Sequence, residues 1–157
     1  MSLKKVLITG ASRGIGQSII EQFYSKEFLP IGTATSEEGI NKILESFSNS
    51  NVKGKAYQLD LNKNESIVNF FEELKSDDIN PDILVNNAGI TKDNLMLRMS
   101  EQDWNDVINI HLTGQFKIMK NFVRGMLKNR WGRIINISSA AAAIGNKGQA
   151  NYVAAKA

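Results

Sequence analysis

Two side chains near the end of the sequence have the residue types and the spacing that proton transfer requires. Tyr152 and Lys156 are four residues apart, so on a helix they would face the same side. A phenol can donate and accept a proton, and a neighbouring ammonium favours its ionised form. A buried tyrosine beside a lysine that extends towards solvent has the same spacing, so the pair alone does not establish an active site.

Short apolar segments that favour strands alternate along the chain with longer segments that favour helices. The predicted strands cover residues 5–8, 29–33, 55–59, 83–86 and 133–137. The predicted helices cover residues 15–26, 37–47, 65–75 and 101–128, and another begins near Tyr152. This alternation predicts an α/β fold of the Rossmann type, a doubly wound parallel sheet with the strand order 3-2-1-4-5.

The composition is that of an ordinary single domain, and we expect one domain over residues 1–157. Hydrophobic residues make up 42% of the chain and charged residues 22%, and no apolar stretch is long enough to span a membrane. The absence of cysteine excludes disulfides and thiolate metal sites and fits a cytoplasmic protein. A net charge of +3 does not establish nucleic-acid binding. We therefore expect no metal site, no membrane contact and no nucleic-acid partner.

A glycine-rich turn joins the first predicted strand to the first predicted helix. Gly10 would permit a tight turn, Gly14 a close approach of a ligand to the backbone, and Gly16 close packing of the helix on the sheet. The helix start offers free N–H groups and the positive end of the helix dipole to a pyrophosphate. Such a turn can be purely structural, but its place between a strand and a helix favours a dinucleotide site.

Residues near the end of the second predicted strand favour NADP over NAD. A site for NAD usually has an Asp or Glu there that binds the ribose 2′-hydroxyl. Here Thr33, Thr35 and Ser36 provide hydroxyl groups, and the first carboxylate is Glu37. Arg13 could add a charge-assisted contact to a 2′-phosphate, unless it is a loop residue that faces solvent.

Three candidate segments follow strands whose carboxyl ends meet at one edge of the predicted sheet. The glycine turn follows the first strand, Asn-Asn-Ala-Gly at 86–89 the fourth, and Ser138 and Ser139 the fifth. In a parallel α/β sheet this edge forms the ligand crevice. Each segment alone could be an ordinary turn, but together with Tyr152 and Lys156 they indicate one active site.

In the order and spacing of these motifs the sequence resembles the short-chain dehydrogenase/reductase family over its whole length. The resemblance rests on T-G-x-x-x-G-x-G at 9–16, N-N-A-G at 86–89, Ser139 and Y-x-x-x-K at 152–156. Within the family the chain most resembles bacterial reductases of fatty acid biosynthesis, through G-A-S-R-G-I-G at 10–16, G-T-A-T-S-E at 32–37 and G-Q-A-N-Y at 148–152.

This resemblance implies an NADP-dependent oxidoreductase that reduces 3-oxoacyl-(acyl-carrier-protein) to 3-hydroxyacyl-(acyl-carrier-protein) with NADPH. One alternative is a related dehydrogenase for another ketone or alcohol, such as a steroid, a sugar or acetoacetyl-CoA. A third possibility is a non-catalytic nucleotide-binding protein or a truncated product. The residues that choose the substrate in this family lie largely beyond those of the present sequence.

The resemblance also implies roles for individual residues. Tyr152 would donate a proton to the substrate carbonyl, Ser139 would orient and polarise that carbonyl, and Lys156 would bind the nicotinamide ribose. Ser138 is the weaker candidate because it lies 14 rather than 13 residues before Tyr152. The residues implied to bind NADP are Gly10, Ser12, Arg13, Gly14, Ile15, Gly16, Thr35, Asp60, Leu61, Asn87, Ala88, Gly89, Tyr152 and Lys156.

One position departs from the family pattern. Where the family commonly has an Asn that supports a water-mediated proton relay to the lysine, this chain has its only histidine, His111. His111 is therefore either a residue that packs the helix or one that holds the relay in another way.

The resemblance to the family also implies a homotetramer. It further implies that an acidic acyl carrier protein docks near Arg124, Lys128 and Arg130.

The sequence stops one residue after Lys156. Strand five would then be an open apolar edge of the sheet, and exposed edges of that kind favour aggregation. We therefore expect the 157 residues to be the front of a longer protein, with the last strands, the last helices and a substrate lid still to follow.

Overall fold

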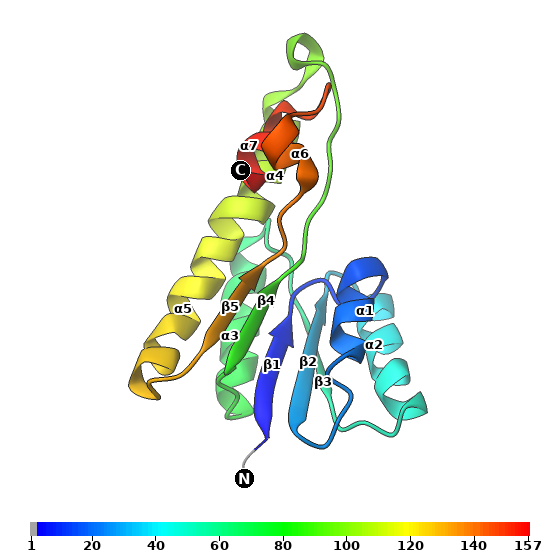
Figure 1. Cartoon of the computed structure of the whole chain (residues 1–157), viewed down its shortest axis with the longest axis vertical. Coiled ribbons are helices and arrows are strands. Elements are labelled where there is room, and N and C mark those ends of the chain that lie inside the picture. Colours follow the sequence, from blue (N-terminus) through cyan, green and yellow to red (C-terminus); the bar gives the residue numbers. More distant parts are fainter. Residues whose placement is uncertain (1–2) are drawn as a thin grey trace.

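The fold of the computed structural model, which describes residues 3–157, is a parallel sheet covered by helices on both faces (Figure 1). The strands are β1 (Lys4–Ile8), β2 (Phe28–Ala34), β3 (Lys55–Gln58), β4 (Ile83–Asn86) and β5 (Arg133–Asn136). All neighbouring strands pair in parallel, in the order β3-β2-β1-β4-β5. The predicted Rossmann-type fold and its strand order are thus confirmed.

Two hydrophobic clusters hold the helices against the sheet. Successive side chains of a strand point to opposite faces, so Val6 and Ile8 of β1 enter one cluster and Leu7 enters the other. The first cluster includes residues of α1 (Gly14–Glu21) and α2 (Glu37–Asn49). The second includes residues of α3 (Asn64–Ser76) and α5 (Gln115–Lys128). β1 is therefore buried on both sides, as the apolar sequence of this strand requires.

The predicted single helix over residues 101–128 is wrong in one respect. The chain forms α4 (Glu101–Ile108), a π-helical segment η2 (Asn109–Gly114) and then α5. A side chain at Gly114 would overlap the backbone and side chain of Leu61, so the segment approaches the loop after β3 closely. π-Helical turns inside helices are frequent at functional sites, and this one carries His111.

Shorter elements follow the carboxyl ends of β4 and β5. They are η1 (Met96–Arg98), α6 (Ala140–Ile144) and α7 (Ala150–Lys156). The alanine run at 140–143 forms α6 because alanine favours helix and Ser139 caps its first turn. Gly145, which follows α6, has a φ of +73° that is readily accessible only to glycine. The first helix is also shorter than predicted and ends at Glu21 rather than at residue 26.

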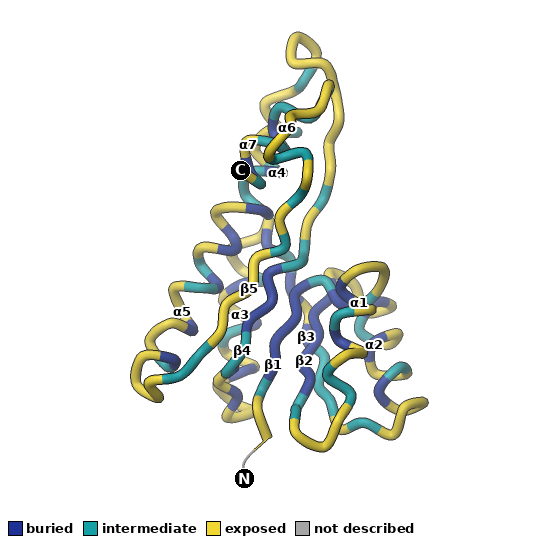
Figure 2. The backbone as a smooth tube through the Cα atoms, in the orientation of Figure 1, coloured by how far each residue is buried: buried dark blue, intermediate teal, exposed yellow. Residues whose placement is uncertain are grey.

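β5 lies at the edge of the sheet, and all four of its residues are exposed (Figure 2). By contrast, the central residues of β1 and β4 are almost completely buried. Within residues 3–157, none of the helices combines the length and the hydropathy needed to cross a bilayer.

Candidate active site

The glycine turn between β1 and α1 has the backbone geometry that its sequence predicts. Gly10 and Gly14 have φ values of +67° and +56°, in the left-handed region that favours glycine. A Cβ at residue 16 would overlap the carbonyl oxygen of Gly10, so α1 can start this close to the strand only with Gly16. The turn therefore places backbone groups, rather than side chains, beside the N-terminus of α1.

The loop after β4 is bound to this turn through Asn87 and Thr9. The Nδ2 of Asn87 donates to the carbonyl oxygens of Thr9 and Gly10, at 2.9 and 3.0 Å. In return, the Oγ1 of Thr9 accepts from the N–H groups of Asn87 and Ala88, both at 3.0 Å. The amide of Asn87 thus fixes the two loops relative to each other and shapes the space between them.

One cavity of about 440 Å³ opens at the carboxyl edge of the sheet. Its volume lies within the range typical of small-molecule and cofactor sites. Its lining contains every predicted cofactor residue that precedes Tyr152, namely Gly10, Ser12, Arg13, Gly14, Ile15, Gly16, Thr35, Asp60, Leu61, Asn87, Ala88 and Gly89. Ile90 and Ile110 also line it, although no sequence motif pointed to them. The glycine backbone and the exposed Arg13 and Thr35 fit a phosphate-bearing dinucleotide.

Asp60 and Leu61 form the side of this cavity after β3. One carboxylate oxygen of Asp60 accepts from the N–H of Asn62 at 3.0 Å, and the other lies 3.4 Å from Nζ of Lys63. A carboxylate can accept about four hydrogen bonds, so these contacts leave capacity for the amino group of an adenine. Leu61 is buried and packs against the π-helical segment, so it supplies an apolar surface next to that carboxylate.

Tyr152 and Lys156 lie on α7, which is hydrogen-bonded to the segment that follows β5. The Nζ of Lys156 lies 6.0 Å from the centre of the Tyr152 ring and donates to the carbonyl oxygen of Ile137 at 2.5 Å. Ser138 donates from Oγ to the carbonyl oxygen of Lys156 at 3.2 Å. Burial lowers the pKa of Lys156 from its ordinary value. Ser138 therefore supports the backbone of α7.

Ser139 lies in the connection between β5 and α6, directly before the first residue of α6. Its Oγ accepts from the N–H of Ala141 at 3.2 Å and so caps α6. A hydroxyl has two acceptor sites and one donor, so the proton of Ser139 is still available to a ligand. Tyr152 and Lys156, the two remaining predicted cofactor residues, do not line the cavity of about 440 Å³. Lys156 instead lines a second cavity of about 680 Å³ together with His111 and Ser138.

His111 is almost fully buried and lies against the loop after β4. Its Nε2 lies 3.0 Å from the backbone nitrogen of Ile90 and 2.8 Å from the carbonyl oxygen of that residue. A side chain at Gly89 would overlap the imidazole. Burial lowers the pKa of His111; the hydrogen bond to Ile90 opposes this effect, and the charge of Lys156 adds to it. The ring is consequently neutral near pH 7.

A buried polar residue that the sequence motifs did not indicate is Asn151. Its side chain has no exposed surface and bonds to the backbone of three residues, on the loop after β4, on α4 and on α7. Its position directly before Tyr152 was the available signal, but an asparagine at the start of a helix is common enough to pass as an ordinary cap.

Known proteins resemble this chain over nearly all of its length. The model of the short-chain dehydrogenase family matches residues 4–157. The 3-oxoacyl-(acyl-carrier-protein) reductase FabG of Pseudomonas aeruginosa is 47% identical over 154 residues, which are 98% of this chain and 62% of that protein. FabG of Haemophilus influenzae is 46% identical over 157 residues, 100% of this chain and 64% of that protein. FabG of Escherichia coli K12 is 46% identical over 154 residues, 98% of this chain and 62% of that protein.

The chain thus spans slightly less than two thirds of the length of these curated relatives. The family match, in contrast, covers the whole sheet, the glycine turn and α7. The chain belongs to the short-chain dehydrogenase family.

Proposed function

We propose that the whole protein is an NADP-dependent oxidoreductase that reduces 3-oxoacyl-(acyl-carrier-protein) to the 3-hydroxyacyl form with NADPH, in cytoplasmic fatty acid biosynthesis. The observation that carries the proposal is the arrangement at the carboxyl edge of the sheet. The dinucleotide-sized cavity lies after β1, β3 and β4, and α7 with Tyr152 and Lys156 is bonded to the end of β5. The names of the FabG relatives support the choice of substrate.

The side chains proposed for catalysis can each donate a hydrogen bond to a ligand. When bound, NADPH supplies the hydride. Tyr152 donates its hydroxyl proton to the carbonyl oxygen of the substrate, and the free proton of Ser139 bonds to the same oxygen. An ammonium has three donors, and Lys156 uses one of them on Ile137, so two are available for the nicotinamide ribose and the phenol. As a cation, Lys156 favours the phenolate that forms when the proton leaves.

The choice of NADPH rests on Arg13 and Thr35 at the rim of the cavity. Both are exposed, and residues 33–36 at the end of β2 contain no carboxylate that would bind a ribose 2′-hydroxyl. A guanidinium binds a phosphate through a charge-assisted contact, so Arg13 would favour the cofactor that carries a 2′-phosphate.

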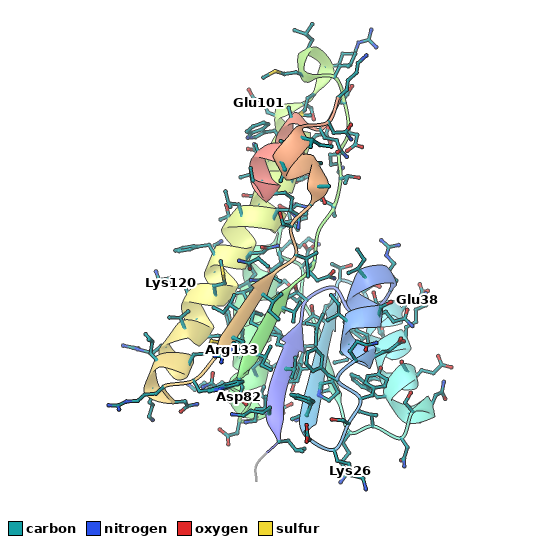
Figure 3. All side chains as sticks on the ribbon, in the orientation of Figure 1. Lys26, Glu38, Asp82, Glu101, Lys120 and Arg133 are labelled. Carbon is teal, nitrogen blue, oxygen red and sulfur yellow. The ribbon has the colours of Figure 1, made fainter. Side chains whose placement is uncertain are left out.

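Docking of the acyl carrier protein is assigned to the basic residues at the far end of α5. Arg124 and Lys128 are exposed on the second half of α5, and Arg130 follows its end. Lys120 lies earlier on α5 and Arg133 at the start of β5, on the same side of the molecule (Figure 3). Such charges steer an acidic partner. Since α5 spans about 21 Å, this surface lies well away from Tyr152 of the same chain.

We also propose that the protein forms a homotetramer through the helices that cover residues 101–128. Phe116, Val123 and Leu127 are exposed apolar residues of α5, and their spacing places them on one face of that helix. Contact between copies would bury this face.

The direct test is NADPH oxidation by the full-length protein with acetoacetyl-(acyl-carrier-protein) as substrate. Tyr152→Phe should lower kcat by a factor of about 10² to 10⁴, the usual contribution of general acid catalysis, with NADPH binding retained. Tyr24→Phe is the matched control, since the Tyr24 hydroxyl contacts Ser46 between α1 and α2. Equal turnover by the wild type and Tyr152→Phe would contradict the mechanism. Turnover of other ketones but not of the carrier-bound substrate would favour a related dehydrogenase.

A further inference from the structure

We infer that Asn151 is a positioning residue that fixes where α7 holds Tyr152 and Lys156. The inference rests on the function proposed above, because it assigns Asn151 a part in the same reaction. It does not assign Asn151 a contact with substrate or cofactor. A set of hydrogen bonds joins α7 to the loop after β4 and to α4.

The side chain of Asn151 is completely buried and makes three hydrogen bonds to backbone groups. Its Nδ2 donates to the carbonyl oxygen of Lys92 at 3.0 Å and to that of Asp103 at 3.2 Å. Its Oδ1 accepts from the N–H of Tyr152 at 2.8 Å. A buried amide of this kind has few ways to move, because each lost bond would leave a polar group unpaired. Its position is therefore strongly determined by Lys92 and Asp103.

The bonds of Asn151 belong to a longer junction between residues 92–94 and residues 148–151. The N–H of Asn94 donates to the carbonyl oxygen of Gly148 at 2.9 Å. The side chain of Gln149, which precedes α7, donates to a carboxylate oxygen of Asp93 at 3.0 Å. α7 has only seven residues, so its own helical hydrogen bonds cannot fix its orientation. The junction supplies that orientation from outside the helix.

The same loop reaches Tyr152 by a second route. Ile90 lies two residues before Lys92 and bonds to His111, and the imidazole of His111 contacts the phenol ring of Tyr152. The loop after β4 thus holds the backbone of Tyr152 through Asn151 and its ring through His111. Ala88 and Gly89 of this loop line the cofactor cavity. Asn151 consequently sets the position of the phenol relative to the loop that borders the cofactor.

Positioning and simple stabilisation predict different kinetics. If Asn151 only stabilises the fold, a variant loses activity in proportion to its loss of folded protein. If Asn151 positions Tyr152, a folded variant has a lower kcat and an unchanged Kd for NADPH. A displacement of about 1 Å at a reacting group can cost on the order of 100-fold in rate.

The first test is Asn151→Asp in the full-length protein. The carboxylate keeps the size of the side chain and its acceptor for the N–H of Tyr152, but it cannot donate to Lys92 and Asp103. We expect kcat to fall on the order of 100-fold, with the Kd for NADPH unchanged in a fluorescence titration. Asn49→Asp is the matched control, because Asn49 is exposed on α2, which lies far from α7 (Figure 1). It should keep the wild-type kcat.

The second test is Asn151→Gln, which keeps both amide donors on a side chain that is one methylene longer. A longer side chain can satisfy Lys92 and Asp103 only if α7 shifts, so the expected result is a reduced kcat in a folded protein. Wild-type kcat in Asn151→Gln, with losses in Asn151→Asp that match its unfolded fraction, would overturn the inference.

Hydrogen exchange separates this inference from the proposed function. Asn151→Asp should accelerate amide exchange in α7 relative to β1, whether or not the wild type turns over the carrier-bound substrate. An inactive wild type would defeat the proposed function, and unchanged exchange in α7 would defeat the assignment of Asn151.

Discussion

The imidazole of His111 meets the phenol ring of Tyr152 edge to face, with ring centres 5.2 Å apart and planes at 89°. This is a favourable geometry for aromatic rings, because the positive edge of one faces the negative face of the other. The two residues come from different elements, His111 from the π-helical segment and Tyr152 from α7. His111 therefore does more than pack within its own helix.

The buried, neutral state of His111 predicts a loss of stability in acid. An unfolded histidine binds a proton near pH 6.5, whereas burial holds the pKa of folded His111 lower. Between these two values the unfolded state binds more protons, so the free energy of unfolding falls as pH falls through 6.5. Below the pKa that His111 has in the folded protein, its protonation causes no further loss of unfolding free energy. His111→Phe keeps a ring beside Tyr152 and should remove this part of the pH dependence.

Urea unfolding of the wild type and His111→Phe at about pH 8 and about pH 5 measures the effect. The variant is expected to be less stable at the higher pH by about 1–3 kcal/mol, since the backbone of Ile90 loses its partner. The difference between the two proteins should narrow at the lower pH. A constant difference at both values would show that His111 does not titrate on unfolding.

Much of the fold follows from the sequence because each strand and each of the first helices has its own local signal. The strand β4 has the predicted bounds, and α3 differs by one residue at each end. The π-helical segment had no such signal. It depends on the contact of Gly114 with Leu61, which lies in a distant part of the chain. Residues 101–128 keep an ordinary helical pattern, so periodicity predicts one unbroken helix.

The cofactor cavity was predictable because parallel strands place all their carboxyl ends at one edge. Its lining contains the predicted residues of the glycine turn and of the loops after β2, β3 and β4. The hydrogen-bond partners of individual polar side chains were not predictable from the sequence. The amide of Asn87 is bonded to Thr9 and Gly10, and Asn151 spans three elements. Such pairings depend on tertiary contacts that no local pattern encodes.

Arg13 should decide between the two nicotinamide cofactors. It precedes α1, its side chain does not cap that helix, and it is exposed at the rim of the cavity with Thr35. A charge-assisted hydrogen bond contributes about 1.5–3 kcal/mol, which corresponds to roughly 10- to 150-fold in affinity. Arg13→Ala in the full-length protein should weaken NADPH binding by such a factor and leave NADH binding unchanged.

Fluorescence titration with each cofactor tests this prediction. Lys26→Ala is the control, because Lys26 is an exposed cation between α1 and β2, outside the cavity lining (Figure 3). If Arg13→Ala weakened NADPH and NADH equally, Arg13 would contact a group that both cofactors share, and the preference for NADP would need another cause.

The two glycines near the start of α1 should respond differently to alanine. At Gly14 a Cβ would have no neighbour within 4 Å, so Gly14→Ala meets only the strain of a φ of +56°. That strain is about 1–2 kcal/mol. At Gly16 the Cβ would overlap the carbonyl oxygen of Gly10 and crowd the side chain of Asn87, both of which belong to the cavity lining. Gly16→Ala should therefore destabilise the protein further and abolish NADPH binding.

At residue 16, helix propensity favours alanine and therefore opposes the destabilisation that the overlap with Gly10 predicts. Inside a helix without such a contact, replacement of glycine by alanine stabilises the protein by about 1 kcal/mol. A loss of unfolding free energy in Gly16→Ala must then come from the contact with the end of β1. Gly14→Ala should lose only the stability that the strain of its φ costs, since its added methyl group meets no protein atom within 4 Å. If Gly16→Ala were as stable as the wild type and bound NADPH normally, α1 could not lie as close to Gly10 as the structure places it.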